Sequence, residues 1–268
     1  MYLALDIGGT QTRIAYSENC SKFDEPVIFD TPENPNIAFE AIKNKIDEIV
    51  EGEHIQGICV GIAGVLDPEH NSLLKSPHLN EWVGFPLKKK FQESFGENVY
   101  IENDTDIVGL GEYSDGAGRT YDNFVYITIS TGIGGVKIVN NKFIKSKFGF
   151  EPGHQILNTE TMQNWEDLAS GTAVEKKFGM HPKEVAKTDS WNEIEKYINI
   201  GLHNSILHWS PEILVIGGSM SRDLNVERLR EGIGKIMKIH PALPEIKIAE
   251  LGSLGGIYGG FAFLRGKV

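Results

Sequence analysis

The segment LALDIGGTQTRIA, Leu3 to Ala15, has the pattern of two short strands joined by a glycine turn. Apolar residues alternate with other residues on both sides of Gly8-Gly9, which is a signal for a β-hairpin. We expect the first strand at Tyr2 to Ile7 and the second at Thr12 to Tyr16. This segment therefore predicts the hairpin that opens an α/β domain.

A similar segment, YITISTGIGGVKIV, Tyr126 to Val139, lies about half the chain further on. It also reads as strand, glycine-rich turn and strand, with the first strand expected at Phe124 to Ser130. The similarity between the two segments predicts two α/β domains of the same type that face each other across a cleft. Such clefts are a common place for ligand sites.

The remaining pattern indicates where the two domains divide. A glycine-rich break, Ser114 to Gly118, follows the first set of elements. We expect an N-terminal α/β domain at residues 1–115 and a C-terminal α/β domain at 116–253, with a C-terminal helix at about 254–268 packing back onto the first domain. Other predicted elements are helices at 37–50, 105–113 and 191–209 and strands at 55–62, 99–102, 212–216 and 246–249.

Two local signals concern the ends of helices. Ser190 lies three residues before Glu193, which is the spacing of a capping box and predicts how the helix from Trp191 begins. The C-terminal helix contains glycines that predict close packing against a neighbouring helix, at positions 255, 256, 259 and 260.

Composition excludes several classes of protein. The net charge of -11 over 268 residues argues against a nucleic-acid-binding surface, which needs clustered Lys and Arg. No run of about 18 apolar residues predicts a membrane span. The N-terminus lacks the basic region of a signal peptide, so we expect a cytoplasmic protein. The two cysteines, Cys20 and Cys59, do not have the spacing of a thiolate zinc site.

The first glycine turn is a candidate phosphate-binding loop. Gly8 and Gly9 can adopt backbone angles that other residues resist, so that backbone N–H groups converge on a phosphate oxygen. Thr10 adds a hydroxyl donor and Arg13 a positive charge. Asp6, at the end of the strand, could hold Mg²⁺ through water.

The second glycine turn could form a similar cradle with Thr131, Gly132, Gly134 and Gly135. A lone glycine-rich hairpin is often only a tight turn. Two such loops, together with the Gly217-Gly218 pair after a third strand, favour a nucleotide site. Neither loop matches the Walker pattern, and neither opens a βαβ unit of the dinucleotide-binding type.

An ordered series of motifs resembles the ROK sugar kinases, a branch of the actin-like ATPase and hexokinase superfamily. The resemblance covers nearly the whole chain and implies two domains of the actin-like ATPase (ribonuclease H-like) fold. The similar segments are ALDIGGTQTRIA, GIAGVLD, PHLNEWVGFPL, IENDTDIVGLGE, ITISTGIGG, EPGH, WEDLASG and LVIGGSMS.

The resemblance implies transfer of the γ-phosphoryl group of ATP, with Mg²⁺, to a hexose hydroxyl. Asp104 corresponds to the general base, which orients the hydroxyl and takes its proton. Asp106 is the alternative candidate for the general base. An acidic residue at the start of a helix is, however, explained by its favourable interaction with the helix dipole.

The resemblance also implies the sugar ligands. Glu151 and Glu166 can each accept two hydroxyl protons, and His154 can donate or accept. A solvated acid remains the alternative for Glu166, and a buried structural histidine the alternative for His154. The full implied set is Gly64, Asn80, Asn103, Asp104, Glu151, His154 and Glu166. Glucose is favoured over mannose, fructose, N-acetylglucosamine and N-acetylmannosamine, and a homodimer is implied.

The sequence departs from the family in one place. Many ROK members have a cysteine-rich zinc loop after ExGH, with the histidine as a ligand. Here the corresponding segment is Asn158 to Asn164, NTETMQN, without cysteine. We therefore expect no zinc, and His154 held instead by packing from Trp165 and by nearby hydrogen bonds.

Two other functions remain as alternatives. ROK repressors have a helix-turn-helix segment before the first phosphate motif, whereas here that motif begins at Leu3. A catalytically idle sugar- or nucleotide-sensing protein is the first alternative, and the intact Asp104 and glycine loops argue against it. An actin- or chaperone-like ATPase with a protein client is the second, and the sugar motifs between Gly61 and Glu166 argue against it.

Overall fold

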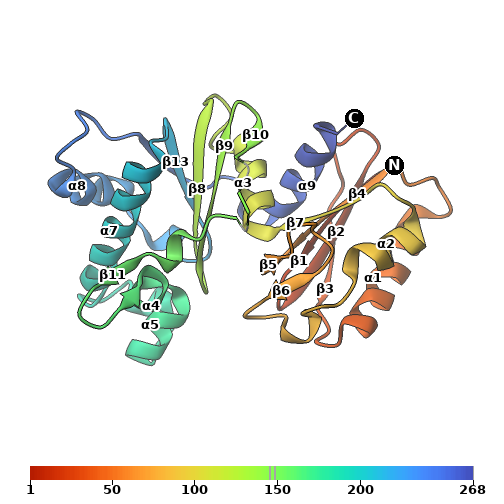
Figure 1. The fold of residues 1–268 in the computed structure, drawn as a ribbon, viewed down its shortest axis with the longest axis horizontal. Helices are drawn as coiled ribbons and strands as arrows, with labels where there is room; N and C mark the ends of the chain where they lie inside the picture. Colours follow the sequence, from red (N-terminus) through yellow and green to blue (C-terminus); the bar gives the residue numbers. More distant parts are fainter. Residues whose placement is uncertain (145, 148, 268) are drawn as a thin grey trace. The chain divides into compact units, whose positions relative to one another are not determined.

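The chain forms two compact units, each built on a five-stranded sheet (Figure 1). The computed structural model describes residues 1–144, 146–147 and 149–267. The N-terminal unit comprises Met1–Ser114, Ser146–Gly149 and Ser253–Val268, and the C-terminal unit comprises Asp115–Lys145 and Phe150–Gly252.

The sheet of the N-terminal unit begins with the predicted hairpin. β1 pairs antiparallel with β2, which pairs antiparallel with β3, while β4 and β7 extend the sheet on the other side in parallel. The sheet order is β3-β2-β1-β4-β7. The strands are β1 Tyr2–Ile7, β2 Gln11–Ser17, β3 Val27–Asp30, β4 Gly57–Ile62 and β7 Val99–Asn103.

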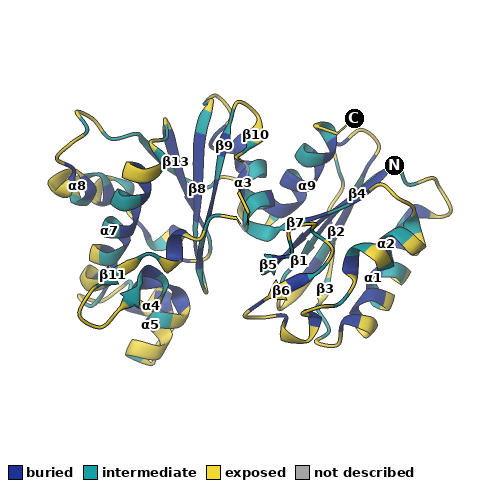
Figure 2. Cartoon of the chain, in the orientation of Figure 1, coloured by how far each residue is buried: buried dark blue, intermediate teal, exposed yellow. Residues whose placement is uncertain are grey.

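The alternation along β1 separates two cores. Leu3, Leu5 and Ile7 pack with α1 (Pro35–Val50) and α2 (Leu87–Phe95). Ala4 faces the opposite side and packs with α3 (Asp104–Ser114) and α9 (Gly255–Arg265). Because side chains alternate along a strand, Asp6 lies on the α9 face, where a Cβ on Gly256 would lie 2.9 Å from Asp6 Cγ. Figure 2 shows that α1 has both buried and exposed residues.

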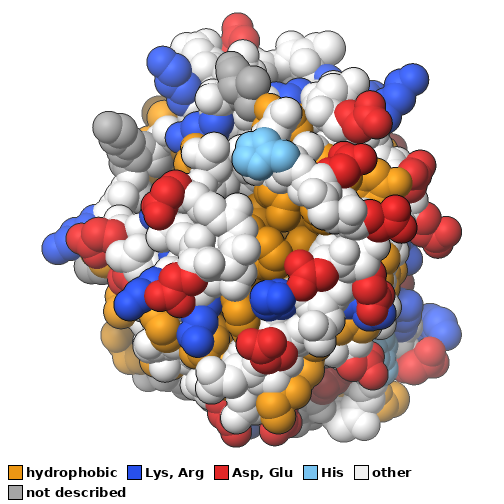
Figure 3. All heavy atoms as spheres, turned by 90° about the vertical axis from the view of Figure 1, so that its right-hand side faces the viewer, with side chains coloured by type: hydrophobic (Ala, Val, Ile, Leu, Met, Phe, Trp, Pro, Cys, Tyr) orange, Lys and Arg blue, Asp and Glu red, His pale blue; other side chains and the backbone are white. Residues whose placement is uncertain are grey.

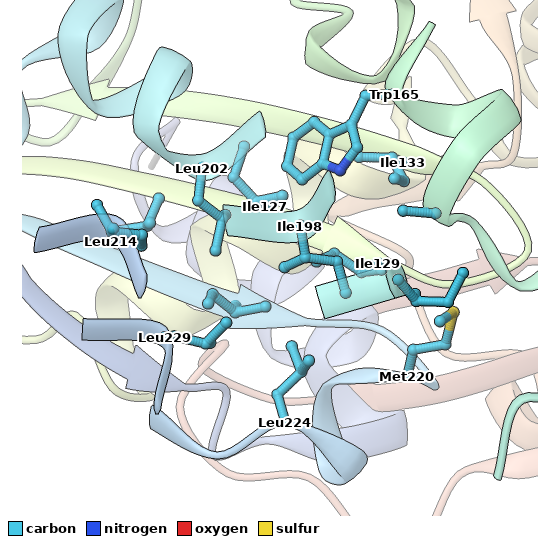
Figure 4. Close-up of a cluster of buried hydrophobic side chains, with 14 of the residues drawn as sticks. Ile127, Ile129, Ile133, Trp165, Ile198, Leu202, Leu214, Met220, Leu224 and Leu229 are labelled. Carbon is cyan, nitrogen blue, oxygen red and sulfur yellow. The ribbon is translucent and has the colours of Figure 1, made fainter. Parts of the chain in front are cut away.

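The C-terminal unit repeats this plan. Its sheet order is β10-β9-β8-β13-β14, with β8, β9 and β10 antiparallel and β8, β13 and β14 parallel. Figure 4 shows Ile127 and Ile129 of β8 packed with Ile198 and Leu202 of α7 beneath the indole of Trp165. The elements are β8 Asn123–Ile129, β9 Ile133–Val139, β10 Lys142–Phe143, β13 Ile213–Gly217, β14 Glu245–Ile248, α7 Trp191–Trp209 and α8 Val226–Ile236.

Short elements carry much of the candidate site. In the N-terminal unit they are β5 Val65–Leu66, β6 Leu73–Lys75 and the 3-10 helix η1 Asn80–Trp82. In the C-terminal unit they are η2 Pro152–His154, β11 Ile156–Asn158, β12 Gln163–Asn164, α4 Trp165–Ala169, α5 Gly171–Phe178, α6 Pro182–Val185, η3 Ser221–Asp223 and η4 Gly252–Leu254.

Both predicted hairpins and the helix from Trp191 are confirmed, but the predicted capping box at Ser190 is wrong. Ser190 itself has helical angles, φ -63° and ψ -22°, and its side chain does not cap the helix. Glu193 instead pairs with Lys177 of α5. A capping box does form at Asn164 and Asp167, at the start of α4.

Charged side chains of both signs are mixed on the surface. On the face shown in Figure 3, acidic side chains are interspersed with Lys and Arg rather than separated from them. Within the described part of the chain, no helix has both the length and the apolar character needed to cross a membrane.

Candidate active site

Asp6 and Arg13 lie opposite each other at the end of the first hairpin. They are register partners in β1 and β2, and Arg13 Nη1 lies 3.6 Å from Asp6 Oδ2. Burial raises the pKa of Asp6 to about 6, against the opposing effect of Arg13. Among the described residues, Arg13 Nε is buried without a hydrogen-bond partner. The pair therefore offers both a carboxylate and an unused cationic donor.

The first phosphate loop needs glycine for space rather than for unusual backbone angles. Gly8 N–H donates to the Gln11 carbonyl over 3.0 Å, and neither Gly8 nor Gly9 has a positive φ, contrary to our reason for expecting glycine there. A Cβ at position 9 would lie 2.4 Å from His78 Cβ. The loop thus packs against the segment that carries Asn80, at the start of η1. Thr10 is exposed at the tip of this loop.

Asp104 lies at the junction of β7 and α3. Its Oδ1 accepts a hydrogen bond from the Thr105 N–H over 2.7 Å. Burial raises the pKa of Asp104 to about 7, and the negative charge of Asp6 adds to the effect. A carboxylate with this pKa is suited to accept a proton near neutral pH.

Asn103, a predicted sugar ligand, also stabilises the start of α3 through its side chain. Its Oδ1 accepts from the N–H groups of Thr105 and Asp106, at 2.8 and 3.1 Å, and so caps α3. Its Nδ2 donates to the Gly64 carbonyl over 2.9 Å. Gly64 has a φ of 138°, and a Cβ there would lie 2.5 Å from the Lys75 carbonyl oxygen. The predicted residues Gly64, Asn103 and Asp104 are therefore brought together.

Glu166 is joined to the second phosphate loop, a contact that the sequence did not reveal. Its Oε2 accepts from the Ile133 N–H over 2.7 Å. A Cβ on Gly132 would lie 2.6 Å from the same oxygen, so the loop between Ser130 and Gly135 leaves room for this carboxylate. One predicted sugar residue and one predicted phosphate loop are thus in direct contact.

The glycine pair at the end of β13, Gly217 and Gly218, lies beside the second phosphate loop. Gly218 has a φ of 88°, and a Cβ there would lie 2.4 Å from the Ile129 carbonyl oxygen. The hydroxyls of Ser130 and Ser219 are 3.3 Å apart. The parallel pairing of β8 and β13 explains this, because it brings the ends of both strands to the same edge. Thr131, Gly134, Gly135 and Gly217 belong to these two neighbouring loops and strand ends.

Glu151 and His154 line a cavity of about 390 Å³ in the C-terminal unit. His154 Nδ1 lies 3.2 Å from Asn164 Nδ2. The other lining residues are Phe150, Pro152, Gln155, Ser205, His208 and Trp209. A larger hollow of about 600 Å³, between the end of α1 and α2, touches none of the predicted site residues.

The residues around His154 do not fit a zinc site of the cysteine type. Within the described ranges, no group of three or more His, Cys, Asp and Glu side chains could hold a metal. Cys20 and Cys59 are both buried in the N-terminal unit. Asp6 and Asp104 offer carboxylate oxygens, the ligands that Mg²⁺ prefers.

Comparisons with known proteins agree with these features. A model described as "ROK family" matches residues 2–267. A glucokinase from Streptomyces coelicolor is 24% identical over 302 residues, covering 96% of this chain and 95% of its own. The crystal structure of a ROK family glucokinase from Streptomyces griseus with glucose and AMPPNP is 25% identical, covers 100% of this chain and 99% of its own, and has a TM-score of 0.80.

The relatives also include a repressor. The xylose repressor of Bacillus subtilis is 29% identical over 187 residues, which are 61% of this chain and 48% of the repressor. The structural match identifies the fold of our chain as the two-domain actin-like ATPase fold.

Proposed function

This chain belongs to the ROK family, and on that premise we propose that it transfers the γ-phosphoryl group of ATP to a hexose hydroxyl. The observation that carries the proposal is the position of Asp104, a carboxylate with a pKa of about 7 beside Asn103 and Gly64. Asp104 acts as the general base that orients the hydroxyl and accepts its proton.

The roles of the surrounding residues follow from the demands of phosphoryl transfer. The reaction depends mainly on positioning and on compensation of charge. Arg13 and the loop N–H groups at Gly9 and Gly132 hold phosphate oxygens, whereas the Gly8 N–H already donates to the Gln11 carbonyl. Asp6 holds Mg²⁺ through water, and the ion supplies positive charge at the phosphates.

The proposed sugar ligands are the residues that the family motifs imply. Gly64, Asn80 and Asn103 come from the N-terminal unit, and Glu151, His154 and Glu166 from the C-terminal unit. Glucose is the proposed substrate, on the strength of the glucokinase relatives. A homodimer and a cytoplasmic location stay predictions.

A panel of sugars tests the proposal. ADP release is measured with ATP, Mg²⁺ and glucose, mannose, fructose, N-acetylglucosamine or N-acetylmannosamine. We expect turnover on at least one sugar, and Asp104→Asn should lower kcat by about 10²–10⁴-fold while the sugar Kd changes by less than about threefold, since a general base contributes on that scale.

Asp106→Asn is the matched control, because it removes the neighbouring carboxylate of the same helix turn. It should keep kcat within about threefold of the wild type. If Asp104→Asn retained most of the activity, or Asp106→Asn lost it, the assignment of the base would be wrong.

A sugar- or nucleotide-sensing protein without catalysis is the second candidate, and the similarity to a xylose repressor favours it. For this second candidate function we expect a folded protein that binds at least one sugar of the panel but phosphorylates none of them.

A further inference from the structure

The contact between Asn164 and His154 determines which nitrogen of the histidine carries the proton. We propose that Asn164 is a positioning residue that places the proton of the neutral His154 ring on Nε2, so that Nε2 donates a hydrogen bond to a hydroxyl of the sugar. The part concerning the sugar rests on the proposed function, whereas the protonation of the ring stands on the geometry of the C-terminal unit.

The direction of the Asn164 amide is set by the start of α4. Asn164 Oδ1 accepts from the Asp167 N–H over 2.7 Å, and Asp167 Oδ2 accepts from the Asn164 N–H over 3.1 Å. The reverse orientation would place the amide NH₂ group against the Asp167 N–H, donor against donor. The capping box therefore turns the NH₂ group of Asn164 toward His154.

The amide direction decides the state of the ring. Asn164 Nδ2 lies 3.2 Å from His154 Nδ1. An amide NH₂ group only donates hydrogen bonds, so Nδ1 must accept and carries no proton. In a neutral ring the proton is then on Nε2, which makes Nε2 the donor.

The residues next to Asn164 and His154 in the chain, Trp165 and Gln155, are tied to their surroundings by packing and hydrogen bonds. Trp165, next to Asn164, is fully buried (Figure 4), and a Cβ on Gly201 would lie 2.2 Å from its indole. The backbone N–H of Trp165 donates to the Gln155 carbonyl over 2.9 Å. The Gln155 side chain donates to the Pro152 carbonyl over 2.9 Å and accepts from Asn204 Nδ2 over 2.8 Å.

These contacts join η2, α4 and α7 around the two side chains. The hairpin of β11 and β12 has no cysteine that could bind a metal beside His154. A hydrogen bond from a helix cap thus fixes the tautomer of the ring, as outer hydrogen-bond partners do for histidines that bind metals.

NMR of the ¹⁵N-labelled protein at pH 8 tests the state of the ring through the correlations of its nitrogens with the ring C–H protons. Wild-type His154 should show an unprotonated Nδ1 and a protonated Nε2. In Asn164→Asp, the carboxylate accepts instead of donating, so the proton should move to Nδ1. Asn164→Ser should keep the cap and give a mixture of the two forms, because serine is a good N-cap residue.

A protonated Nδ1 in the wild type, or the same ring state in Asn164→Asp and the wild type, would overturn the proposal. Asn164→Ser is also the variant that is expected to fold even if Asn164→Asp does not, because it retains the N-cap without adding a charge next to Asp167. A ring state in Asn164→Ser that is identical to the wild type would likewise count against control by Asn164.

Steady-state kinetics tests the consequence for the sugar. Asn164→Asp should raise the sugar KM by about tenfold, the effect of one hydrogen bond, while kcat and the ATP KM stay within about twofold. The control is Asn158→Asp on the same hairpin, where Oδ1 accepts from the Glu160 and Thr161 N–H groups. It introduces the same charge and should leave the sugar KM unchanged.

A double-mutant cycle shows whether Asn164 acts through His154. In a His154→Ala background, Asn164→Asp should change the sugar KM by less than about twofold. An undiminished tenfold effect there would refute the coupling. Absence of turnover in the wild type would contradict the proposed function instead, and sugar Kd values would then replace KM while the NMR result still decides the ring state.

Discussion

At the scale of single residues, Asp104 is the group whose chemistry the tertiary structure changes most. An ordinary aspartate is ionised well below neutral pH, but burial and the nearby Asp6 raise the pKa of Asp104 to about 7. Two interacting carboxylates titrate as a coupled pair, so the charge of one depends on the other. The candidate base is therefore poised near the pH at which the cell works.

This pKa predicts the pH dependence of the reaction. The base must be ionised to accept the hydroxyl proton, so kcat/KM should fall as the pH is lowered through about 7, with a limiting slope of one. The measurement is kcat/KM between about pH 5 and 9 at saturating ATP and low sugar. A profile that stayed flat down to about pH 5 would contradict the assignment of Asp104.

Several residue roles could be predicted from the sequence and others could not. The motifs placed Asp6 and Arg13 at a hairpin end, and the structure pairs them. The contact of Gly9 with His78 and the contact of Glu166 with Ile133 escaped prediction. Both join segments far apart in the chain, and no local pattern records such neighbours.

At the scale of elements, the glycines of α9 explain how it packs against α3. A Cβ on Gly259 would lie 1.7 Å from the Ile107 carbonyl oxygen, and a Cβ on Gly111 would lie 2.4 Å from the Gly255 carbonyl oxygen. The two helices therefore touch backbone to backbone. The close packing expected from the glycines at 255, 256, 259 and 260 is confirmed for Gly259.

A single methyl group should disturb this contact. Gly259→Ala should destabilise the protein by about 2–3 kcal/mol and lower its Tm by about 5 °C or more. The reason is that the new methyl group meets the backbone of α3, which can move away only if the helix is displaced. Gly266→Ala is the control at the end of the same helix, where the nearest atom to a new Cβ is 3.5 Å away and φ is -77°. Equal Tm values for both variants, measured by thermal unfolding, would refute this account of the packing.

The start of α7 shows the limit of prediction at this scale. The Ser190-Glu193 spacing had the form of a capping box, yet Glu193 pairs with Lys177. The capping box at Asn164 and Asp167, which the structure does show, was not singled out from the sequence. A cap depends on the backbone angles of one residue, and tertiary contacts decide those angles.

At the scale of the whole molecule, the chain is a ROK protein whose two cysteines and His154 belong to different units. Cys20 and Cys59 are buried in the N-terminal unit, whereas His154 belongs to the C-terminal unit. The N-terminal unit with the two thiols and the C-terminal unit with the histidine each have a hydrophobic core of their own.

We predict that the purified protein binds no structural zinc. Elemental analysis after mild dialysis should find less than about 0.1 zinc per chain, and a chelator should leave the Tm unchanged, since structural zinc contributes directly to folding stability. A ROK protein with the cysteine-rich loop, treated in the same way, is the positive control. Stoichiometric zinc that survives dialysis would refute the prediction.

The amino-acid sequence by itself determined the two hairpins, the α/β class, the family and the motif residues. These depend on local periodicity, on glycine and on short ordered motifs, which the chain carries in linear order. Only the tertiary structure decided the pKa of Asp104, the contact of Glu166 with the second phosphate loop and the amide direction of Asn164. Burial, charge and hydrogen-bond direction depend on neighbours that the fold brings together from distant parts of the chain.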